Sequence, residues 1–332
     1  MQAFEINENN AGKRLDKYLG KLMPNAPKSF IYKMLRKKNI VLNDKKAEGS
    51  EKTKCGDVVK LYLADDTIKI MRGTDAHQNV QAQTNSMANT KAMAKAKSVP
   101  MQGHVKNISL DVLYQDKHVL LINKPQGILS QKSVPSDVSM VELVNAYLLE
   151  NGYLKETDLE TFHPAVVNRL DRNTSGIICA GISLAGLQDL SELFRNRTMK
   201  KEYLCVVKGV MRSKQHLKGY LVKDHRTNKV KVYKDKPDGE SGKNAERIET
   251  SFAPLSFNEH YTLLCVDLIT GKSHQIRAQL ASIGHPIVGD EKYGDARVNK
   301  SAGAAYGIHY QCLHAWRMTF PKLDGALAGL SE

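Results

Sequence analysis

The sequence predicts an α+β protein, with a mostly antiparallel β-sheet in its larger part and a small α+β domain at its N-terminus. Apolar runs of strand length recur between residues 107 and 332, and most are followed by another strand rather than by a regular helix. Two helical apolar patterns stand close together near the N-terminus. With 332 residues, the chain is long enough for two domains.

Residues 1–64 are predicted to form the small domain. Apolar residues recur at the spacing of one helix face over residues 15–22, and again in a second stretch that starts at Ser29. A turn signal at Asn43-Asp44 and an apolar strand over residues 58–63 then close the unit.

Positive charge is concentrated in this first domain. The chain holds 49 Lys and Arg against 35 Asp and Glu, a net charge of +14, and residues 1–64 carry +7 of it. A Lys-rich helix face is usually no more than a solvated surface. Two adjacent helices of the same sign, with few acids to balance them, instead favour a polyanionic partner. The candidate contacts are Lys13, Arg14, Lys17, Lys33, Arg36 and Lys37.

Residues 65–106 are predicted to be a flexible, low-complexity linker. They contain no Leu, Phe, Tyr or Trp before residue 106 and are rich in Ala, Gln, Asn, Thr, Lys and Met. Such a composition buries too little apolar surface to offset the entropy of ordering. A domain boundary is therefore expected here, followed by a larger domain over residues 107–332.

The elements of the larger domain follow from its apolar spacing. Helices are expected over residues 140–149 and 184–194, and strands over residues 119–122, 176–182, 201–207, 247–252, 261–268 and 313–320.

The segment from His163 to Gly176 is rich in groups that can do chemistry. Asp171 lies between Arg169 and Arg172, directly before an apolar strand. An aspartate with two neighbouring arginines can simply form ion pairs at a surface turn. It can equally belong to a functional site, and the spacing alone does not separate the two interpretations.

A second dense segment runs from Leu268 to Gly294. Arg277 falls in the first turns of an expected helix, where it can present a cation to an anionic partner. His274 and His285 are, by themselves, more typical of hydrogen-bonded structural residues than of ligands.

Several classes of protein are disfavoured by missing motifs. The sequence has no HxxxH, CxxC or clustered carboxylates for a metal, and no GxGxxG or GxxxxGK[ST] for a nucleotide, so neither metal nor organic cofactor is expected. The GxSxG elbow of serine hydrolases is absent. There is no membrane-spanning apolar run and no signal-peptide pattern, and five cysteines are scattered along the chain, which predicts a cytoplasmic protein with reduced thiols.

Four motifs in order resemble one known family. INKPQGILS, NRLDRNTSG, KKEYLCVVKG and TGKSHQIRAQLASIGHPIVGDEKYG together resemble the RluA family of bacterial pseudouridine synthases, over a region from about Asn107 to Phe320. The N-terminal pattern, GKRLDKYL followed by SFIYKMLRKKNIVLN, is similar to the αL-type RNA-binding module of a small-subunit ribosomal protein. Together they look like the members that modify large-subunit (23S) ribosomal RNA. Transfer RNA is the less favoured substrate, and the protein is expected to act as a monomer.

The resemblance implies roles for four residues. Asp171 corresponds to the catalytic aspartate of the RLD motif, and Arg277 to the basic residue that pairs with it. Tyr203 corresponds to the tyrosine that stacks on the target base, and Arg169 to an arginine that takes the place of the flipped base. The chain departs from the family pattern at Asn168, where His is common, and at Ala278-Gln279, where Val-His is common. RNA contacts at Asn168 and Gln279 are therefore expected to differ.

The implied reaction suits a single carboxylate. Pseudouridylation breaks the N1–C1′ bond of uridine, rotates the base and rejoins it through C5, so no water has to be activated, in contrast to glycoside hydrolysis. Asp171 could attack C1′ or remove the 2′ proton, and the sequence does not choose between these routes. The target base must be flipped out of folded RNA, and stacking on Tyr203 offsets part of that cost. The alternative function is an RNA-binding assembly factor with an inactive site.

Overall fold

The computed structural model describes residues 1–73, 109–224 and 226–331, which form two compact units. The described residues of the first unit come from the ranges Met1–Ser109 and Leu148–His163, and those of the second from Leu110–Tyr147 and Pro164–Glu332.

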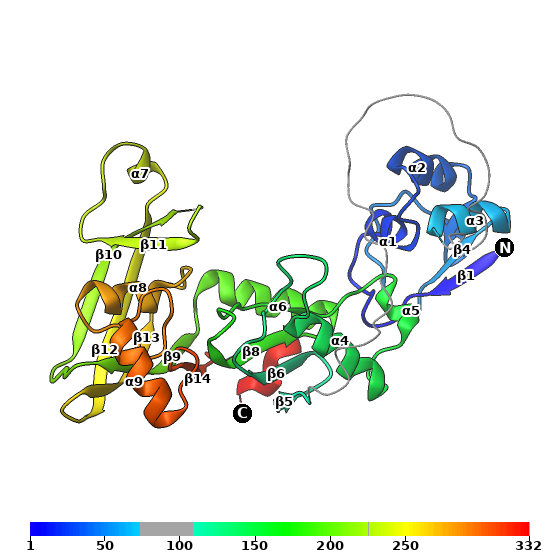
Figure 1. Cartoon of the computed structure of the whole chain (residues 1–332). Helices are drawn as coiled ribbons and strands as arrows, with labels where there is room; N and C mark the ends of the chain where they lie inside the picture. The colour runs from blue at the N-terminus through cyan, green and yellow to red at the C-terminus, as the bar shows by residue number, and fades with distance from the viewer. Residues whose placement is uncertain (74–108, 225, 332) are drawn as a thin grey trace, which may run out of the picture. The chain divides into compact units, whose positions relative to one another are not determined.

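The first unit is a four-stranded antiparallel sheet in the order β1-β4-β2-β3, covered by helices (Figure 1). Its elements are β1 (Gln2–Glu5), α1 (Leu15–Leu22), α2 (Lys28–Arg36), β2 (Ile40–Leu42), β3 (Lys45–Lys46), β4 (Val58–Leu61), α3 (Asp65–Arg72) and α5 (Glu156–Leu159). The predicted helix face of α1 is confirmed, because its apolar residues lie in the core of this unit, namely Leu15, Tyr18, Leu19 and Leu22.

The predicted linker begins too early. Residues 65–72 form α3, whose Ile68 is fully buried in the core of the first unit. The helix ends at Gly73, which adopts the left-handed conformation with φ of 75°. The composition concealed this helix because few apolar side chains attach it, the buried Ile68 and the partly buried Met71. The rest of the predicted linker, residues 74–106, lies outside the described residues.

The segment 148–163 also departs from the predicted domain ranges. It was assigned to the larger domain, but its contacts place it in the first unit. Arg72 Nη2 donates a 2.6 Å hydrogen bond to Glu160, and the ammonium of Lys13 donates to the carbonyl of Thr161 at 2.7 Å. Polar pairs between residues some 90 to 150 positions apart leave no periodic pattern in a sequence.

The second unit is built on one large sheet. Its strand order is β11-β10-β12-β13-β9-β14-β8-β6-β5, with β7 paired to β8. All of these neighbours are antiparallel except β14 and β8, so the predicted α+β class with a mostly antiparallel sheet is confirmed. The strands are β5 (Val112–Gln115), β6 (Val119–Lys124), β7 (Ala165–Val166), β8 (Ser175–Gly181), β9 (Lys200–Lys208), β10 (Gln215–Asp224), β11 (Lys229–Tyr233), β12 (Glu246–Phe257), β13 (Tyr261–Leu268) and β14 (Leu313–Thr319).

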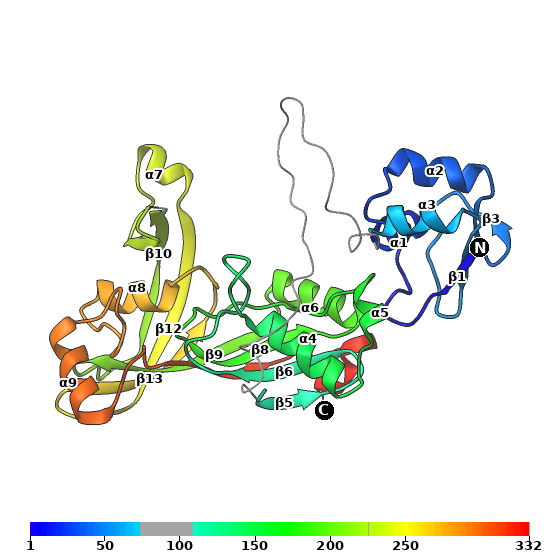
Figure 2. The same cartoon turned by 45° about the vertical axis from the view of Figure 1, so that its right-hand side comes forward.

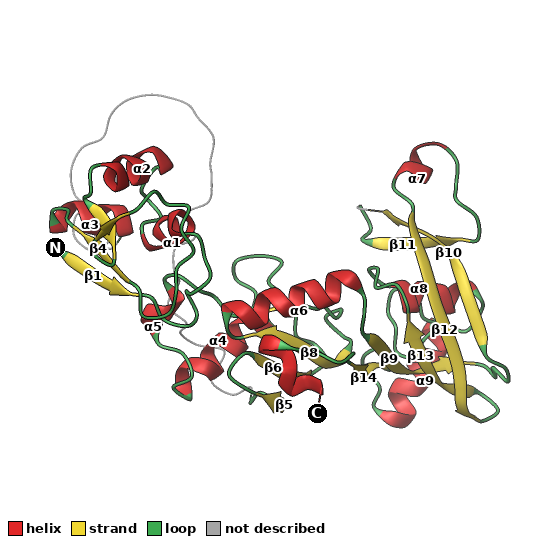
Figure 3. Cartoon of the chain, turned by 180° about the vertical axis from the view of Figure 1, so that it is seen from behind, coloured by secondary structure: helices red, strands yellow, loops and turns green. Residues whose placement is uncertain are grey.

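Five α-helices and a 3-10 helix complete the described part of this unit. They are α4 (Met140–Glu150, ending in the first unit), α6 (Leu184–Asn196), α7 (Gly239–Lys243), α8 (Gln275–Ser282), α9 (Ala296–Tyr306) and a final 3-10 helix (Gly325–Ser331). Figure 2 shows α6 running along β8, where it buries Leu190 and Leu193. Figure 3 shows β10 and β12 as long neighbouring strands, with α7 beyond their upper ends.

The strand β14 joins the two halves of the large sheet. It lies parallel to β8 on one side and antiparallel to β9 on the other. The strands β8 and β14 approach closely at Gly176, where a Cβ would stand 2.2 Å from the carbonyl oxygen of Ala315. Gly176 also has a φ of 112°, so only glycine fits at the start of β8. This junction fixes the loop that precedes β8, which carries Asp171.

Candidate active site

An open cleft of about 1250 Å³ lies over the middle of the large sheet. The loop before β8, the first part of β9 and the loop that leads into α8 all contribute to its lining. Ten Lys and Arg residues line the cleft, against only two carboxylates, Asp171 and Glu291. The cleft is therefore strongly basic, although the larger part of the chain carries only a modest share of the net charge.

Asp171 lies at the tip of a firmly anchored loop. The hydroxyl of Ser130 donates to the carbonyl of Leu170 at 2.9 Å and accepts from its amide at 2.9 Å. On the other side, the fully buried Lys124 donates from its ammonium to the carbonyl of Arg172 at 2.9 Å. The residues on both sides of the carboxylate are thus fixed, which limits the positions that Asp171 can take.

Lys124 is a buried cation that serves the backbone. Besides Arg172, its ammonium donates to the carbonyls of Pro125 at 2.8 Å and Ile128 at 2.7 Å. Burial lowers the pKa of Lys124 to about 8, and the charge of Asp171 opposes this shift. One lysine therefore connects the INKPQG turn to the loop of Asp171.

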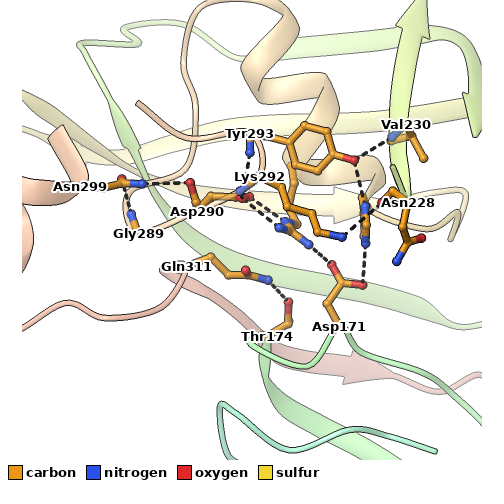
Figure 4. Close-up of polar contacts among 12 residues, drawn as sticks. Asp171, Thr174, Asn228, Val230, Gly289, Asp290, Lys292, Tyr293, Asn299 and Gln311 are labelled. Carbon is orange, nitrogen blue, oxygen red and sulfur yellow. Dashed lines mark hydrogen bonds and ion pairs between the residues drawn. The ribbon is translucent and has the colours of Figure 1, made fainter. Parts of the chain in front are cut away.

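Arg277 links Asp171 to a second, fully buried carboxylate. Its Nη1 donates to Asp171 Oδ2 at 2.7 Å, while Nε and Nη2 donate to the two oxygens of Asp290 at 2.6 and 2.8 Å (Figure 4). The side chain of Asp290 is 0% exposed, that of Arg277 is 6% and that of Asp171 is 28%. Asp290 holds the guanidinium from behind, so its remaining Nη1 points toward the cleft and Asp171.

The charges in this chain stabilise one another. Burial lowers the pKa of Arg277, but the hydrogen bonds and charges of Asp290 and Asp171 outweigh it and raise that pKa above its usual value. Burial raises the pKa of Asp290, and the bond to Arg277 outweighs it, so the pKa of this carboxyl is lowered. The amides of Lys292 and Tyr293 also donate to Asp290, at 2.8 and 3.0 Å.

His274 and Tyr293 form the other side of the site. The hydroxyl of Tyr293 accepts from the amide of Val230 at 2.8 Å and lies 2.9 Å from His274 Nδ1. The Nε2 of His274 lies 3.9 Å from Asp171 Oδ1. Burial lowers the pKa of His274, and the charge of Asp171 opposes this shift. The ring of Tyr293 also lies under the guanidinium of Arg277, whose centre is 5.2 Å from the ring centroid.

Tyr203 and Arg169 line the same cleft as Asp171. Tyr203 is on β9 and 7% exposed, and burial raises its pKa well above the usual value. Arg169 is exposed and, within the part of the chain that the structure describes, has no carboxylate at ion-pair distance. All four residues that the sequence singled out in the larger domain therefore lie on one cleft. Asp171 pairs with Arg277 rather than with its neighbours, which decides against the simple surface turn.

Three supporting residues of the site were not predicted from the sequence, namely Asp290, Lys124 and Tyr293. Asp290 and Tyr293 stand in the quoted segment GHPIVGDEKYG, where an acid one glycine after the apolar pair Ile287-Val288 was the available signal for a buried partner of Arg277. Lys124 stands in the quoted INKPQG segment, between an apolar strand and a turn. Nothing in its spacing indicates that three carbonyls surround it.

The two departures from the family pattern take part in internal contacts. The side chain of Asn168 donates to the carbonyl of Ile177 at 3.1 Å and accepts from the amide of Cys179 at 2.7 Å, so it holds the loop of Asp171 against β8. Gln279 is 1% exposed and accepts from the hydroxyl of Thr250 at 2.5 Å. The side chain of Gln279 is therefore enclosed in the fold, and the expected difference in RNA contact at this position stays a prediction.

The predicted RNA-binding residues of the first unit divide into two groups. Lys17, Lys33, Arg36 and Lys37 are exposed, and Arg14 is exposed but bonded to Asp16 at 3.1 Å. The prediction of an RNA contact at Lys13 is corrected by the structure. Its ammonium is 2.7 Å from both Asn10 Oδ1 and the carbonyl of Thr161 and stands over the ring of Phe162. Burial lowers the pKa of Lys13 to about 8, so this side chain serves the interior and not a ligand.

The helices of both units were compared with what a membrane-spanning helix requires. None of the helices within residues 1–73, 109–224 and 226–331 has both the length and the apolar character that crossing a membrane requires.

Comparison with known proteins identifies the family. The family model described as RNA pseudouridylate synthase matches residues 118–282. Ribosomal large subunit pseudouridine synthase C of Vibrio cholerae is 27% identical over 321 residues, which cover 96% of this chain and 89% of that protein. The protein of the same name from Escherichia coli is 27% identical and covers 95% and 87%, and an uncharacterised RNA pseudouridine synthase of Mycoplasma genitalium is 28% identical and covers 97% and 90%.

A solved structure supports the fold. The human RNA pseudouridylate synthase domain-containing protein 4 superposes with a TM-score of 0.51 at 22% identity, covering 63% of this chain and 83% of that chain. The matched sequence includes Asp171, Tyr203 and Arg277. The chain therefore belongs to the RNA pseudouridylate synthase family, the enzymes that isomerise uridine to pseudouridine in RNA.

Proposed function

We propose that Asp171 is the catalytic residue of this uridine isomerase and that large-subunit ribosomal RNA is its substrate. The observation that carries the catalytic assignment is the chain Asp171–Arg277–Asp290, in which a buried guanidinium orients one accessible carboxylate in a basic cleft. The names of the Vibrio cholerae and Escherichia coli relatives support the choice of RNA.

The geometry supports a separate role for each of the predicted residues. A flipped uridine stacks on Tyr203, which lines the cleft, and Asp171 then faces its ribose. From there, Asp171 either attacks C1′ or removes the 2′ proton, and each route breaks the N1–C1′ bond without water. Arg277 holds the carboxylate in place through Nη1, and Arg169 occupies the space that the base has left in the RNA.

The first unit is proposed to hold the RNA. Lys17 on α1, with Lys33, Arg36 and Lys37 at or near α2, are exposed cations that can contact phosphates. The active unit is proposed to be the monomer.

The catalytic assignment is tested with Asp171→Asn and a matched control, Glu291→Gln. Both substitutions replace a carboxylate of the same cleft by an amide of the same shape. Pseudouridine is mapped in ribosomal and transfer RNA from a strain that lacks the gene, after incubation with each purified protein. Asp171→Asn is expected to form none, and Glu291→Gln to stay within a few fold of the wild type. Modification by Asp171→Asn at the wild-type rate would refute the assignment, and modification confined to transfer RNA would refute the substrate.

The holding role of the first unit is tested without deleting it. A variant with Gln at positions 17, 33, 36 and 37 should bind large-subunit RNA more weakly. The slope of log affinity against log salt should fall by about 0.7–0.9 for each phosphate that the variant can no longer neutralise. An unchanged slope contradicts this role.

A further inference from the structure

Lys201 is a cation on the cleft face of β9 that the catalytic assignment does not use. It precedes Tyr203 by two residues, so both side chains lie on the same face of the strand, about 7 Å apart along it. Both residues line the cleft of Asp171. Lys201 thus stands next to the proposed stacking platform, one step further along the strand.

The acids of this region lie on the other face of the sheet. Glu202, between Lys201 and Tyr203, pairs there with Lys200 at 2.8 Å and Arg317 at 3.8 Å. Asp267 on β13 is in register with Glu202, and residues directly opposite each other in an antiparallel pair share a face. Alternation along β9 therefore turns both carboxylates away from the cleft, and the charge of Asp267 only partly opposes the lowering of the Lys201 pKa.

A second cation stands beside Lys201 in the cleft. Arg197 follows the last turn of α6 and lines the same cleft, and its charge adds to burial in lowering the pKa of Lys201. Within residues 1–73, 109–224 and 226–331, no carboxylate lies at ion-pair distance from either side chain. Two neighbouring cations without an acid between them are arranged as in an anion-binding site.

The local backbone leaves room for this arrangement. A Cβ at Gly271 would stand 3.7 Å from the ammonium of Lys201, so this glycine borders Lys201 without a side chain over it. Arg197 ends α6 in the left-handed conformation, with φ of 56°, at a position where glycine is the usual residue. The fold thus places an arginine where backbone conformation alone favours glycine.

We propose that Lys201 and Arg197 form a phosphate subsite, which binds a phosphodiester of the RNA next to the uridine whose base stacks on Tyr203. The proposal rests on the proposed function, because it needs the uridine at Asp171. RNA offers a phosphodiester on each side of the ribose of every internal nucleotide. A partly desolvated ammonium without a counterion favours such an anion, and the pair then fixes where the chain of the RNA enters the cleft.

The test compares two adjacent lysines on opposite faces of β9. Lys201→Met removes the cation in the cleft, and Lys200→Met is the matched control, since Lys200 lies on the far face with Glu202. Both are made in Asp171→Asn protein, and affinity for large-subunit ribosomal RNA is measured against potassium chloride concentration. Lys201→Met should lower the log–log slope by about 0.7–0.9, Lys200→Met should not change it, and Lys201→Arg should restore it.

A second measurement identifies the phosphate. Short RNAs that carry the mapped uridine are made with one neutral methylphosphonate on either side of it. One of them should bind the Asp171→Asn protein about tenfold more weakly, and adding Lys201→Met should cause no further loss with that RNA. Equal slopes for the two methionine variants, or methylphosphonate effects that persist in full in Lys201→Met, overturn the proposal. Failure of the proposed function is read separately, as absence of pseudouridine with the wild type, because the salt slopes need no turnover.

Discussion

The pair Arg277–Asp290 allows a quantitative test of the site, through the substitution Asp290→Asn. Two charge-assisted hydrogen bonds join the pair, at 2.6 and 2.8 Å, and Asp290 is fully buried. Each such bond contributes about 1.5–3 kcal/mol, and removing one partner of a buried pair costs about 3–5 kcal/mol. Asn keeps one acceptor oxygen and Arg277 keeps Asp171, so the expected loss in the free energy of unfolding is about 3 kcal/mol.

Urea unfolding followed by tryptophan fluorescence measures this loss. Trp316 on β14 is the single tryptophan of the chain, so the signal reports on the second unit alone. The partner variants are Arg277→Met and the double variant with Asp290→Asn. Because the double variant leaves no unpaired buried charge, it should be about 2 kcal/mol more stable than the sum of the single losses predicts.

Catalysis should respond more strongly than stability. Without Asp290 behind it, the guanidinium of Arg277 can turn, and a displacement of about 1 Å at a catalytic group costs about 100-fold in rate. We therefore expect kcat to fall about 100-fold for Asp290→Asn, while RNA affinity changes little because Asp290 does not reach the cleft surface. A loss below about 1 kcal/mol, strict additivity in the double variant, or an unchanged kcat would refute this account.

Three further outcomes are expected. Lys13→Met should speed hydrogen exchange at Thr161 and leave RNA affinity unchanged, whereas Lys17→Met should weaken RNA binding alone; equal effects on RNA would contradict the burial of Lys13. Burial lowers the pKa of Lys124 from 10.5 to about 8, so the folded chain loses this proton before the unfolded chain does. Loss of this proton removes one of the three hydrogen bonds that the Lys124 ammonium donates, so kcat/KM should fall on the alkaline side with an apparent pKa of about 8. The same fall is expected in Lys13→Met protein, which lacks the lysine of the first unit whose pKa is also about 8. Tyr203→Leu should weaken binding of a target RNA by about 1–3 kcal/mol, measured by titration in Asp171→Asn protein.

The sequence predicted those parts of the protein that depend on neighbouring residues. The apolar spacing of residues 15–22 places four side chains on one helix face, and that face is buried. The alternation of residues 201–207 predicts β9, since strand periodicity is local. The ordered motifs around Asp171 and Arg277 also identified the site, because each motif is continuous in the chain.

Partners that are distant in the chain could not be predicted in this way. Lys13 and Lys17 belong to the same basic pattern near the first helix, yet Lys13 is buried against Thr161 and Lys17 is exposed. Only the position of segment 148–163 explains this difference in exposure. Asp290 acts on Asp171 through Arg277, over 119 residues of sequence, because the parallel pairing of β14 with β8 joins the two halves of the sheet. The linker boundary was wrong for a similar reason, since one buried residue, Ile68, attaches α3.

The charge of the protein depends both on what the sequence predicts and on what the tertiary structure decides. By itself, the sequence predicted a polyanionic partner, and its motifs predicted the family and singled out Asp171 as the candidate catalytic residue. Only the tertiary structure decided where the positive charge acts, because strand alternation and loop placement put ten Lys and Arg residues around the cleft and turn acids such as Glu202 to the far face. Net charge is a sum over residues, whereas a binding site depends on the direction in which each side chain points.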